Sequence, residues 1–286
     1  KVRIVFSLLS LIDKKITLEQ VPRWQARLES LECLFTFSSE LKQTTQSILM
    51  LRKLVKEVKR SKRLPKLLHA VLELGNVVNH DTEYGNAKGF EISVISELIK
   101  SKSKCKKSYT MLDFVIESVE RKAGGDALNL SEDWPSASDC NGANLHVLNK
   151  TFVAYEQEIQ RLRANLERAS KAKKKIPGDE YIRVMTPFLK RAQEQLNCSK
   201  AIFDSLVKAF DECLEWYGYD IPAHKTEPRQ QFLDSVLRVG GAVDSAYVVF
   251  ALLIISHSNT NSIMTNTGTT TWKTIEMSSQ SGCVLW

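Results

Sequence analysis

The sequence lacks the features that mark disulfide-rich secreted proteins, zinc proteins and membrane-spanning proteins. None of its six cysteines forms a C-x-x-C pair, and their wide spacing favours free thiols in a reducing compartment. The apolar run from Ala246 to Ile255 has about half the length that a bilayer-spanning helix needs. Another apolar run, from Ile4 to Ile12, follows basic residues, but no small-x-small cleavage site comes after it. We therefore expect no signal peptide and no membrane partner.

Catalytic and metal-binding patterns are also missing. The stretch LELGNVVNHDTEYGNAKGF, residues 72–90, has neither the Lys-Ser/Thr pair of a P-loop nor G-x-G-x-x-G spacing. His80 and Asp81 are adjacent, but none of the five histidines pairs with another at the spacing of metal ligands on a helix. No G-x-S-x-G segment and no Cys-His arrangement indicates a nucleophile. The prediction is a protein that is not an enzyme and that holds no cofactor and no metal ion.

Positive charge is in excess and is clustered. The net charge is +7, and five lysines with no acid lie between Lys100 and Lys107. Two smaller clusters, VKRSKRLPK and KAKKK, occupy residues 58–66 and 171–175. Such clusters are either solvated charges at helix ends and in loops, or a surface that attracts an acidic partner. Few aromatic residues interleave with the lysines to stack on bases, so we expect no nucleic acid.

Helical periodicity dominates, and no stretch alternates as a strand does. Apolar residues recur on one helical face from Leu41 to residue 58. A second stripe begins near Leu64, with Pro65 in its first turn, and reaches Gly75. A short helix is expected over 111–119. The pattern predicts an all-α fold.

The clearest signal is a heptad seam from Leu145 to Leu166, in which apolar residues alternate at spacings of three and four. Pro177-Gly178 should end this helix, and Asp179 should cap a second one that reaches about Tyr217. Together they predict a long antiparallel helical hairpin, a coiled-coil rod. After about residue 247 a polar, aperiodic Ser/Thr-rich sequence follows. We therefore divide the chain into a helical body, 1–247, and a disordered or unrelated tail, 248–286.

The stretch at 72–90 joins two of these patterns through a polar loop. We expect Gly75 to interrupt the helix, with Asn76 and Asn79 satisfying backbone groups freed at the break. The loop from 80 to 88 is polar, and Gly89-Phe90 opens the next apolar pattern. A polar loop between rigid helices is either a docking place for another chain or a plain connection.

Several segments, in this order, resemble the formin homology 2 (FH2) family over about residues 18–245. They are Val21-Pro22-Arg23-Trp24-x-x-Arg27-Leu28, Gly75-Asn76-x-x-Asn79, Gly89-Phe90-x-Ile92, Lys102-Ser103, Leu112-Asp113-Phe114 and Phe188-Leu189-Lys190-x-Ala192-Gln193.

The resemblance implies a domain that nucleates actin filaments or processively elongates them at their barbed ends. FH2 domains form a head-to-tail homodimeric ring, in which each half-ring contacts actin through a knob and a post and an N-terminal lasso wraps the partner's post. By that likeness Lys102 contacts actin. The likeness also implies a protein of the cytoplasm and cytoskeleton that receives profilin-actin through a region upstream of the domain. The residues that would build the post are Gly75, Asn76, Asn79, Gly89 and Phe90.

The sequence also departs from the family pattern. The lasso, the linker and the start of the knob are expected before residue 1, which would impair nucleation by the chain as it stands. Glu97 and Lys100 carry charges opposite to the usual ones, and Val77 and Val78 are smaller than the usual pair. The alternative hypothesis is a coiled-coil scaffold without actin activity, whose heptad seam pairs with a partner helix.

Overall fold

The structure, a computed structural model, describes residues 21–92, 94–103, 109–123, 127–172, 178–219 and 227–264. These residues contain no strand; their extended pairing is a single antiparallel bridge between Lys102 and Thr110. The expected all-α fold class is confirmed. The elements are α2 (Trp24–Arg60), α3 (Arg63–Val78), α4 (Val94–Lys100), α5 (Met111–Ala123), α6 (Leu130–Asp133), the 3-10 turn η2 (Ser138–Cys140), α7 (Leu145–Ser170), α8 (Tyr181–Trp216) and α9 (Glu227–Met264).

The helices group into two compact units, and the boundary between them falls within α2 and within α8. Unit 1 contains residues 1–49 and 144–207, and unit 2 contains residues 50–143 and 208–286.

In unit 1 the heptad helix α7 lies antiparallel to α8. The side chain of Asn144 caps α7 by accepting a hydrogen bond from the Val147 N–H at 3.1 Å. Arg163 bonds to Gln193 at 3.2 Å, whereas the earlier Glu156 bonds to the later Lys200. Residue numbers therefore run in opposite directions along the two helices, which confirms the expected hairpin.

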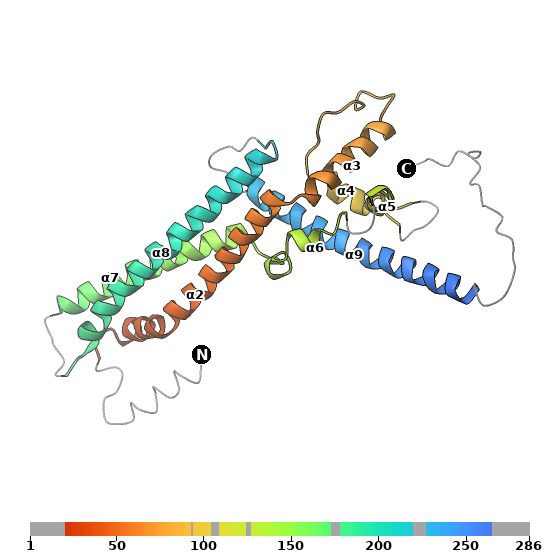
Figure 1. Ribbon diagram of the computed structural model, residues 1–286. Coiled ribbons are helices and arrows are strands. Elements are labelled where there is room, and N and C mark those ends of the chain that lie inside the picture. The colour runs from red at the N-terminus through yellow and green to blue at the C-terminus, as the bar shows by residue number, and fades with distance from the viewer. Residues whose placement is uncertain are drawn as a thin grey trace. The chain divides into compact units, whose positions relative to one another are not determined.

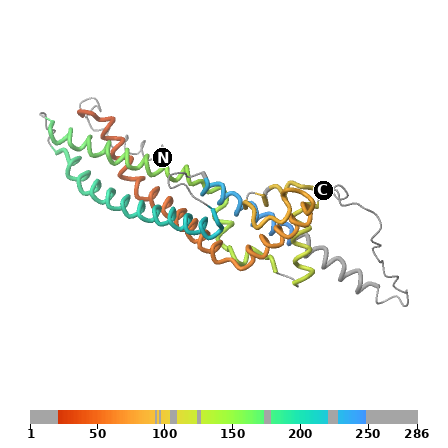
Figure 2. Tube along the Cα trace, turned by 90° about the horizontal axis from the view of Figure 1, so that it is seen from above, coloured from red at the N-terminus to blue at the C-terminus, as the bar shows by residue number. Residues whose placement is uncertain are grey.

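Helix α2 lies along this hairpin as a third helix (Figures 1 and 2). Phe37 of α2 is 1% exposed, and its ring stands edge-on to those of Tyr155 in α7 and Phe188 in α8, at centroid distances of 5.5 and 6.3 Å. The Thr45 hydroxyl also donates to the Ser199 Oγ at 2.9 Å. The apolar seam is therefore covered within one chain, whereas a coiled-coil scaffold would leave it open for a partner helix.

Unit 2 has its own core, in which α9 packs against α4, α5 and α6. The short helix α6, which the sequence did not predict, carries Asp133. This carboxylate accepts hydrogen bonds from the Ser61 hydroxyl at 2.7 Å and from the N–H groups of Lys62 and Arg63 at 2.9 and 3.1 Å. The Arg63 guanidinium pairs with it as well. Asp133 thus holds the start of α3 from a position 70 residues away. Fully buried core side chains include those of Leu64, Leu67, Ile95, Leu112, Ile116, Leu128 and Trp134.

Three helix ends differ from the sequence expectations. Helix α2 begins at Trp24, well before Leu41, because Cys33 and Phe37 extend its buried face at a spacing of four residues. The expected interruption at Gly75 is wrong, because α3 continues to Val78. Helix α9 continues to Met264, so residues 248–264 are helical where a disordered tail was expected. Residues 265–286 lie outside the described residues.

Replacing Asp133 by Asn should destabilise the protein by about 2 kcal/mol at neutral pH, since the charge-assisted bonds at the start of α3 are weakened. Burial raises the pKa of Asp133, but the hydrogen bonds from Ser61, Arg63 and Lys62 outweigh it and hold the pKa below its ordinary value of 3.8. A lowered folded pKa gives stability that is present above the unfolded pKa and is lost as the pH falls through the folded one.

Urea unfolding of the wild type and Asp133→Asn at a series of pH values checks this prediction. The stability difference should shrink as the pH drops below about 4. The exposed Asp139→Asn variant serves as the control and should show little difference at any pH. A difference for Asp133→Asn that stays constant into strong acid would contradict the assignment.

Candidate functional site: an apolar groove beside an exposed lysine

In unit 2 the end of α3, the following loop, α4 and the start of α5 enclose a groove of about 240 Å³. Four of the five residues expected to build the post line this groove, namely Gly75, Asn76, Asn79 and Phe90, and Gly89 does not. The sequence did not point to the contributions of Tyr84, Ala87 and Met111, which the tertiary fold brings to the groove from separate segments. The remaining lining residues are Val71, Leu72, Leu74, Val78, Val94 and Leu98.

Asn76 ties the last turn of α3 to the far end of the loop. Its Nδ2 donates to the Ala87 carbonyl at 3.0 Å, and its Oδ1 accepts from the Ala87 N–H at 2.7 Å. One amide side chain therefore satisfies both backbone groups of Ala87, which a residue without both a donor and an acceptor could not do. Asn79 acts through its backbone, since its N–H bonds to the Gly75 carbonyl at 3.0 Å and its carbonyl accepts from the Thr82 N–H at 2.9 Å.

Gly85 closes the turn at the tip of this loop. A Cβ atom at Gly85 would lie 2.6 Å from the Asn79 carbonyl oxygen and 2.9 Å from that of His80. Both neighbours are backbone atoms, so they cannot move away as a flexible side chain would. Gly75 is different, because a Cβ there would meet nothing within 4 Å and would point into open space. The sequence thus identified Gly75 but missed the steric requirement at Gly85.

The opposite wall is held in place from the end of α8. The Ile92 N–H donates to the Tyr219 hydroxyl at 3.0 Å, just before α4 begins. Ile92 and Ile95 are buried, with exposed fractions of 5% and 0%, and anchor α4 to the core. Phe90 and Val94 remain at the groove.

The groove has an apolar rim. Tyr84 and Val78, which line the groove, are 70% and 48% exposed, and Val77 next to Val78 is 73% exposed. Burying such side chains against a partner removes apolar area from water, at roughly 25 cal/mol per Å². Apolar residues gathered at a groove on a protein surface mark a place where another molecule can bind.

Lys102 lies outside the groove, on a small hairpin that follows α4. It pairs with Thr110 in the antiparallel bridge, supported by the bonds from Ser103 N to Tyr109 O at 2.8 Å and from Met111 N to Ser101 O at 2.9 Å. Its side chain is exposed and makes no hydrogen bond or ion pair with another described residue. The bridge therefore positions the backbone of Lys102, while its ammonium group has no partner in the described part of the chain.

The far side of this hairpin continues into α5 through a capping box. The Thr110 N–H donates to the Asp113 carboxylate at 2.7 Å, and the Asp113 N–H donates to the Thr110 hydroxyl at 3.2 Å. Burial, followed by a hydrogen bond to Glu117, raises the pKa of the Tyr109 phenol, which therefore stays protonated and donates to that carboxylate.

Two departures from the family pattern lie next to each other in α4. Lys100 Nζ contacts Glu97 Oε1 at 2.7 Å, one helical turn apart. The reversed charges at these two positions therefore still form an ion pair. This pairing also leaves Lys102, rather than Lys100, as the uncommitted cation among the described residues of this lysine cluster.

Within the described residues, no group of three or more His, Cys, Asp and Glu side chains could hold a metal ion. The described helices likewise include none with the length and apolar character needed to cross a bilayer.

The described residues thus form an all-helical fold with an apolar surface groove and, on the segment after α4, an exposed lysine. The family model of the Formin Homology 2 Domain matches residues 15–238, well over half of the chain. The chain belongs to the formin homology 2 family.

Similar proteins include two kinds of formin relative. The chain is 29% identical over 202 residues to Disheveled-associated activator of morphogenesis 1-A of Xenopus laevis, covering 68% of this chain and 18% of that protein. It is 25% identical over 207 residues to Protein diaphanous of Drosophila melanogaster, covering 71% and 18%. For Protein diaphanous homolog 2 of Homo sapiens the identity is 24% over 205 residues, covering 72% and 18%. The chain thus spans less than a fifth of the length of these relatives.

Alanine substitutions at the two glycines should have opposite effects on stability. Gly75→Ala should stabilise α3 by about 0.5–1 kcal/mol, because alanine loses less backbone entropy in a helix and its methyl group enters open space. Gly85→Ala should cost about 1–3 kcal/mol, because two carbonyl groups must move. Thermal unfolding of both variants checks this, and equal effects would contradict the geometry of the loop.

Proposed function

We propose that this chain is an actin-assembly domain that binds the barbed ends of filaments and nucleates or processively elongates them, without catalysing a reaction. The observation that carries the proposal is the match to the formin homology 2 family over residues 15–238. Membership of that family implies actin as the partner, and with it a place in the cytoplasm and cytoskeleton.

The charge at Lys102 supports this proposal. Actin is acidic, and the Lys102 ammonium group, which pairs with no other described residue, can pair with a carboxylate without first breaking such an ion pair. Because the bridge to Thr110 limits backbone motion, little conformational entropy is lost when the contact forms. Lys102 is therefore the residue of unit 2 that we assign to the actin contact.

The groove supports the second part of the proposal, a homodimer. We assign it to an apolar lasso segment of a second copy of the full-length protein, with Asn76 and Asn79 shaping the receiving surface and Phe90 forming part of its wall. Gly89 precedes Phe90 without lining the groove, so we assign it to the shape of this loop. Delivery of profilin-actin belongs to regions upstream of the domain.

The alternative, a coiled-coil scaffold, has less support. Its seam would have to pair with a partner helix, yet the ring of Phe37 lies against α7 and α8 at the centre of that seam. A partner helix would first have to displace α2 and expose these apolar side chains.

A Lys102→Asp variant should bind barbed ends at least about tenfold more weakly, since charge reversal turns an attractive contact into a repulsive one. Single-filament microscopy of growing actin measures the occupancy of the ends directly. A Lys150→Asp variant carries the same change in net charge at an exposed position of α7 and should behave like the wild type. Equal loss in both variants would show that net charge, and not Lys102, controls binding.

A Gly75→Leu variant should block self-association of the full-length protein while the fold persists. The larger side chain is compatible with a helix but occupies the groove, because a Cβ at this position faces open space. His69→Leu, at an exposed position of the same helix outside the groove, is the matched control. Sedimentation analysis should show monomers for Gly75→Leu and dimers for His69→Leu. A dimeric Gly75→Leu protein would rule the groove out as the dimer contact.

A further inference from the structure

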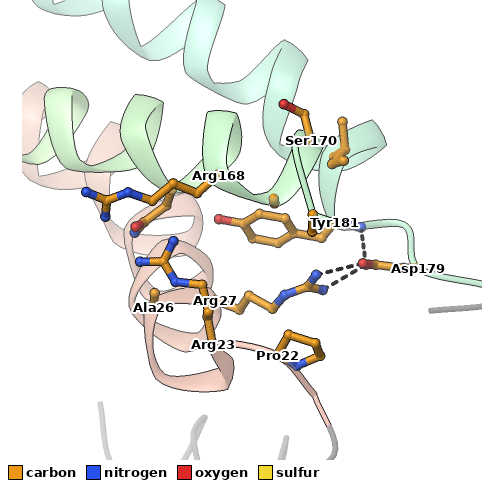
Figure 3. Close-up of a pocket in the computed structure, with 12 residues that line it drawn as sticks. Pro22, Arg23, Ala26, Arg27, Arg168, Ser170, Asp179 and Tyr181 are labelled. Atoms are coloured by element: carbon orange, nitrogen blue, oxygen red, sulfur yellow. Dashed lines mark hydrogen bonds and ion pairs between the residues drawn. The ribbon is translucent and has the colours of Figure 1, made fainter. Parts of the chain in front are cut away.

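A second cavity, of about 270 Å³, lies in unit 1 where α2 and α8 begin and α7 ends (Figure 3). Three arginines line it. Arg23 immediately precedes α2, Arg27 lies in the first turn of α2, and Arg168 lies in the last turn of α7. Asp179 is the one carboxylate among the described residues that line this cavity. The cavity is therefore cationic, and neither the family match nor the groove in unit 2 gives it a role.

One of the three arginines, Arg27, already forms an ion pair within the cavity. Arg27 donates from both terminal nitrogens to the two oxygens of Asp179, at 2.9 and 2.7 Å, and its guanidinium lies over the Tyr181 ring at 4.8 Å. The hydrogen bonds from Arg27 outweigh burial and lower the pKa of Asp179, which keeps it ionised. Arg27 and Asp179 thus form a bidentate ion pair, and Asp179 Oδ1 also accepts from the Tyr181 N–H at 3.0 Å.

The other two arginines are uncommitted. Arg23 and Arg168 are exposed and make no hydrogen bond or ion pair with another described residue. In Figure 3 both guanidinium groups lie on the side of the Tyr181 ring away from Asp179.

Two acids that neighbour the lining residues Arg168 and Asp179 pair with other cations instead. Glu167, the neighbour of Arg168, pairs with Lys171, and Glu180 pairs with Arg183. Two guanidinium forks that have no acceptor among the described residues therefore face one end of the cavity.

We propose that this cavity binds a phosphorylated serine or threonine of a protein partner, held between Arg23 and Arg168. A carboxylate has two oxygens, which a single fork fills, as the Arg27–Asp179 pair demonstrates within the same cavity. A phosphate group has three terminal oxygens and up to two negative charges, so it can accept from two forks at once. Arginine clusters recognise phosphorylated peptides in this way.

The rest of the lining favours a peptide over a sugar phosphate. Pro22, Ala26, Ala169 and Ile182 present apolar surface, and Asn165 and Ser170 offer polar groups that can bond to a peptide backbone. An apolar residue next to the phosphorylated side chain can cover this surface, whereas the hydroxyl groups of a sugar would lose hydrogen bonds to water there. We therefore expect a leucine or a similar residue beside the phosphorylated position of the ligand.

The test uses fluorescence anisotropy with the whole chain and a labelled peptide pool that has a fixed phosphoserine-leucine centre and randomised flanks. The phosphorylated pool should bind at least about tenfold more tightly than control pools that carry serine or glutamate in place of phosphoserine. Inorganic phosphate should compete with the phosphorylated pool for the cavity. The Arg23→Ala/Arg168→Ala double variant should lose about tenfold or more in affinity. Arg23→Lys/Arg168→Lys keeps both charges but removes the forks, and it should also bind clearly more weakly.

The matched control is the Lys150→Ala/Arg191→Ala double variant, which removes the same charge from exposed positions of α7 and α8. It should bind the pool as the wild type does. All variants should have the melting temperature of the wild type, because the side chains of the substituted residues make no hydrogen bond or ion pair with another residue in the described part of the chain.

Three results would overturn the proposal. They are equal binding of the phosphorylated and unphosphorylated pools, full binding by the lysine double variant, and arginine-dependent sedimentation with phosphoinositide vesicles in the absence of peptide binding. Actin binding can fail or succeed in any of these cases, so the two proposals are tested independently.

Discussion

The packing of α2 against the α7–α8 hairpin is the constraint on which unit 1 depends. Phe37 places one ring against both helices of the hairpin, and the Thr45–Ser199 hydrogen bond adds a polar contact in the same interface. Apolar packing supplies most of the stability, and a polar pair within it favours one register of the three helices. Because α2 and α8 each continue into unit 2, the same two helices also carry residues of the second unit.

In unit 2 the groove results from local chemistry that keeps a polar loop rigid. Asn76 satisfies both backbone groups of Ala87, and Gly85 permits the tight turn between them. Tyr219 holds the opposite wall at Ile92. These interactions are polar and steric, while the surface that they create is apolar. Rigid walls reduce the entropy that a binding partner must lose, which is what a docking surface requires.

Much of the fold could be predicted from the sequence, because its long helices carry regular apolar spacing. The hairpin and the all-α class follow from the seam that begins at Leu145. The first half of α2 was missed because the apolar Leu34 and Phe35 lie between the buried Cys33 and Phe37 and obscure the helical spacing of the buried face. Contacts between distant segments could not be derived from spacing at all. Asp133 reaches α3 across 70 residues, and Tyr84 and Met111 meet at the groove only in the folded chain. For the candidate site, the resemblance named Gly75, Asn76, Asn79, Gly89 and Phe90 as post residues, and all but Gly89 line the groove. The physical roles of Asn76 and Gly85 required coordinates.

We propose that this helical domain acts by holding the end of an actin filament. The most direct measurement is two-colour single-filament microscopy of the fluorescently labelled full-length protein during actin growth. The account predicts labelled particles that remain on barbed ends while the filaments lengthen. Barbed ends that stay unlabelled at protein concentrations well above those of the ends would contradict it.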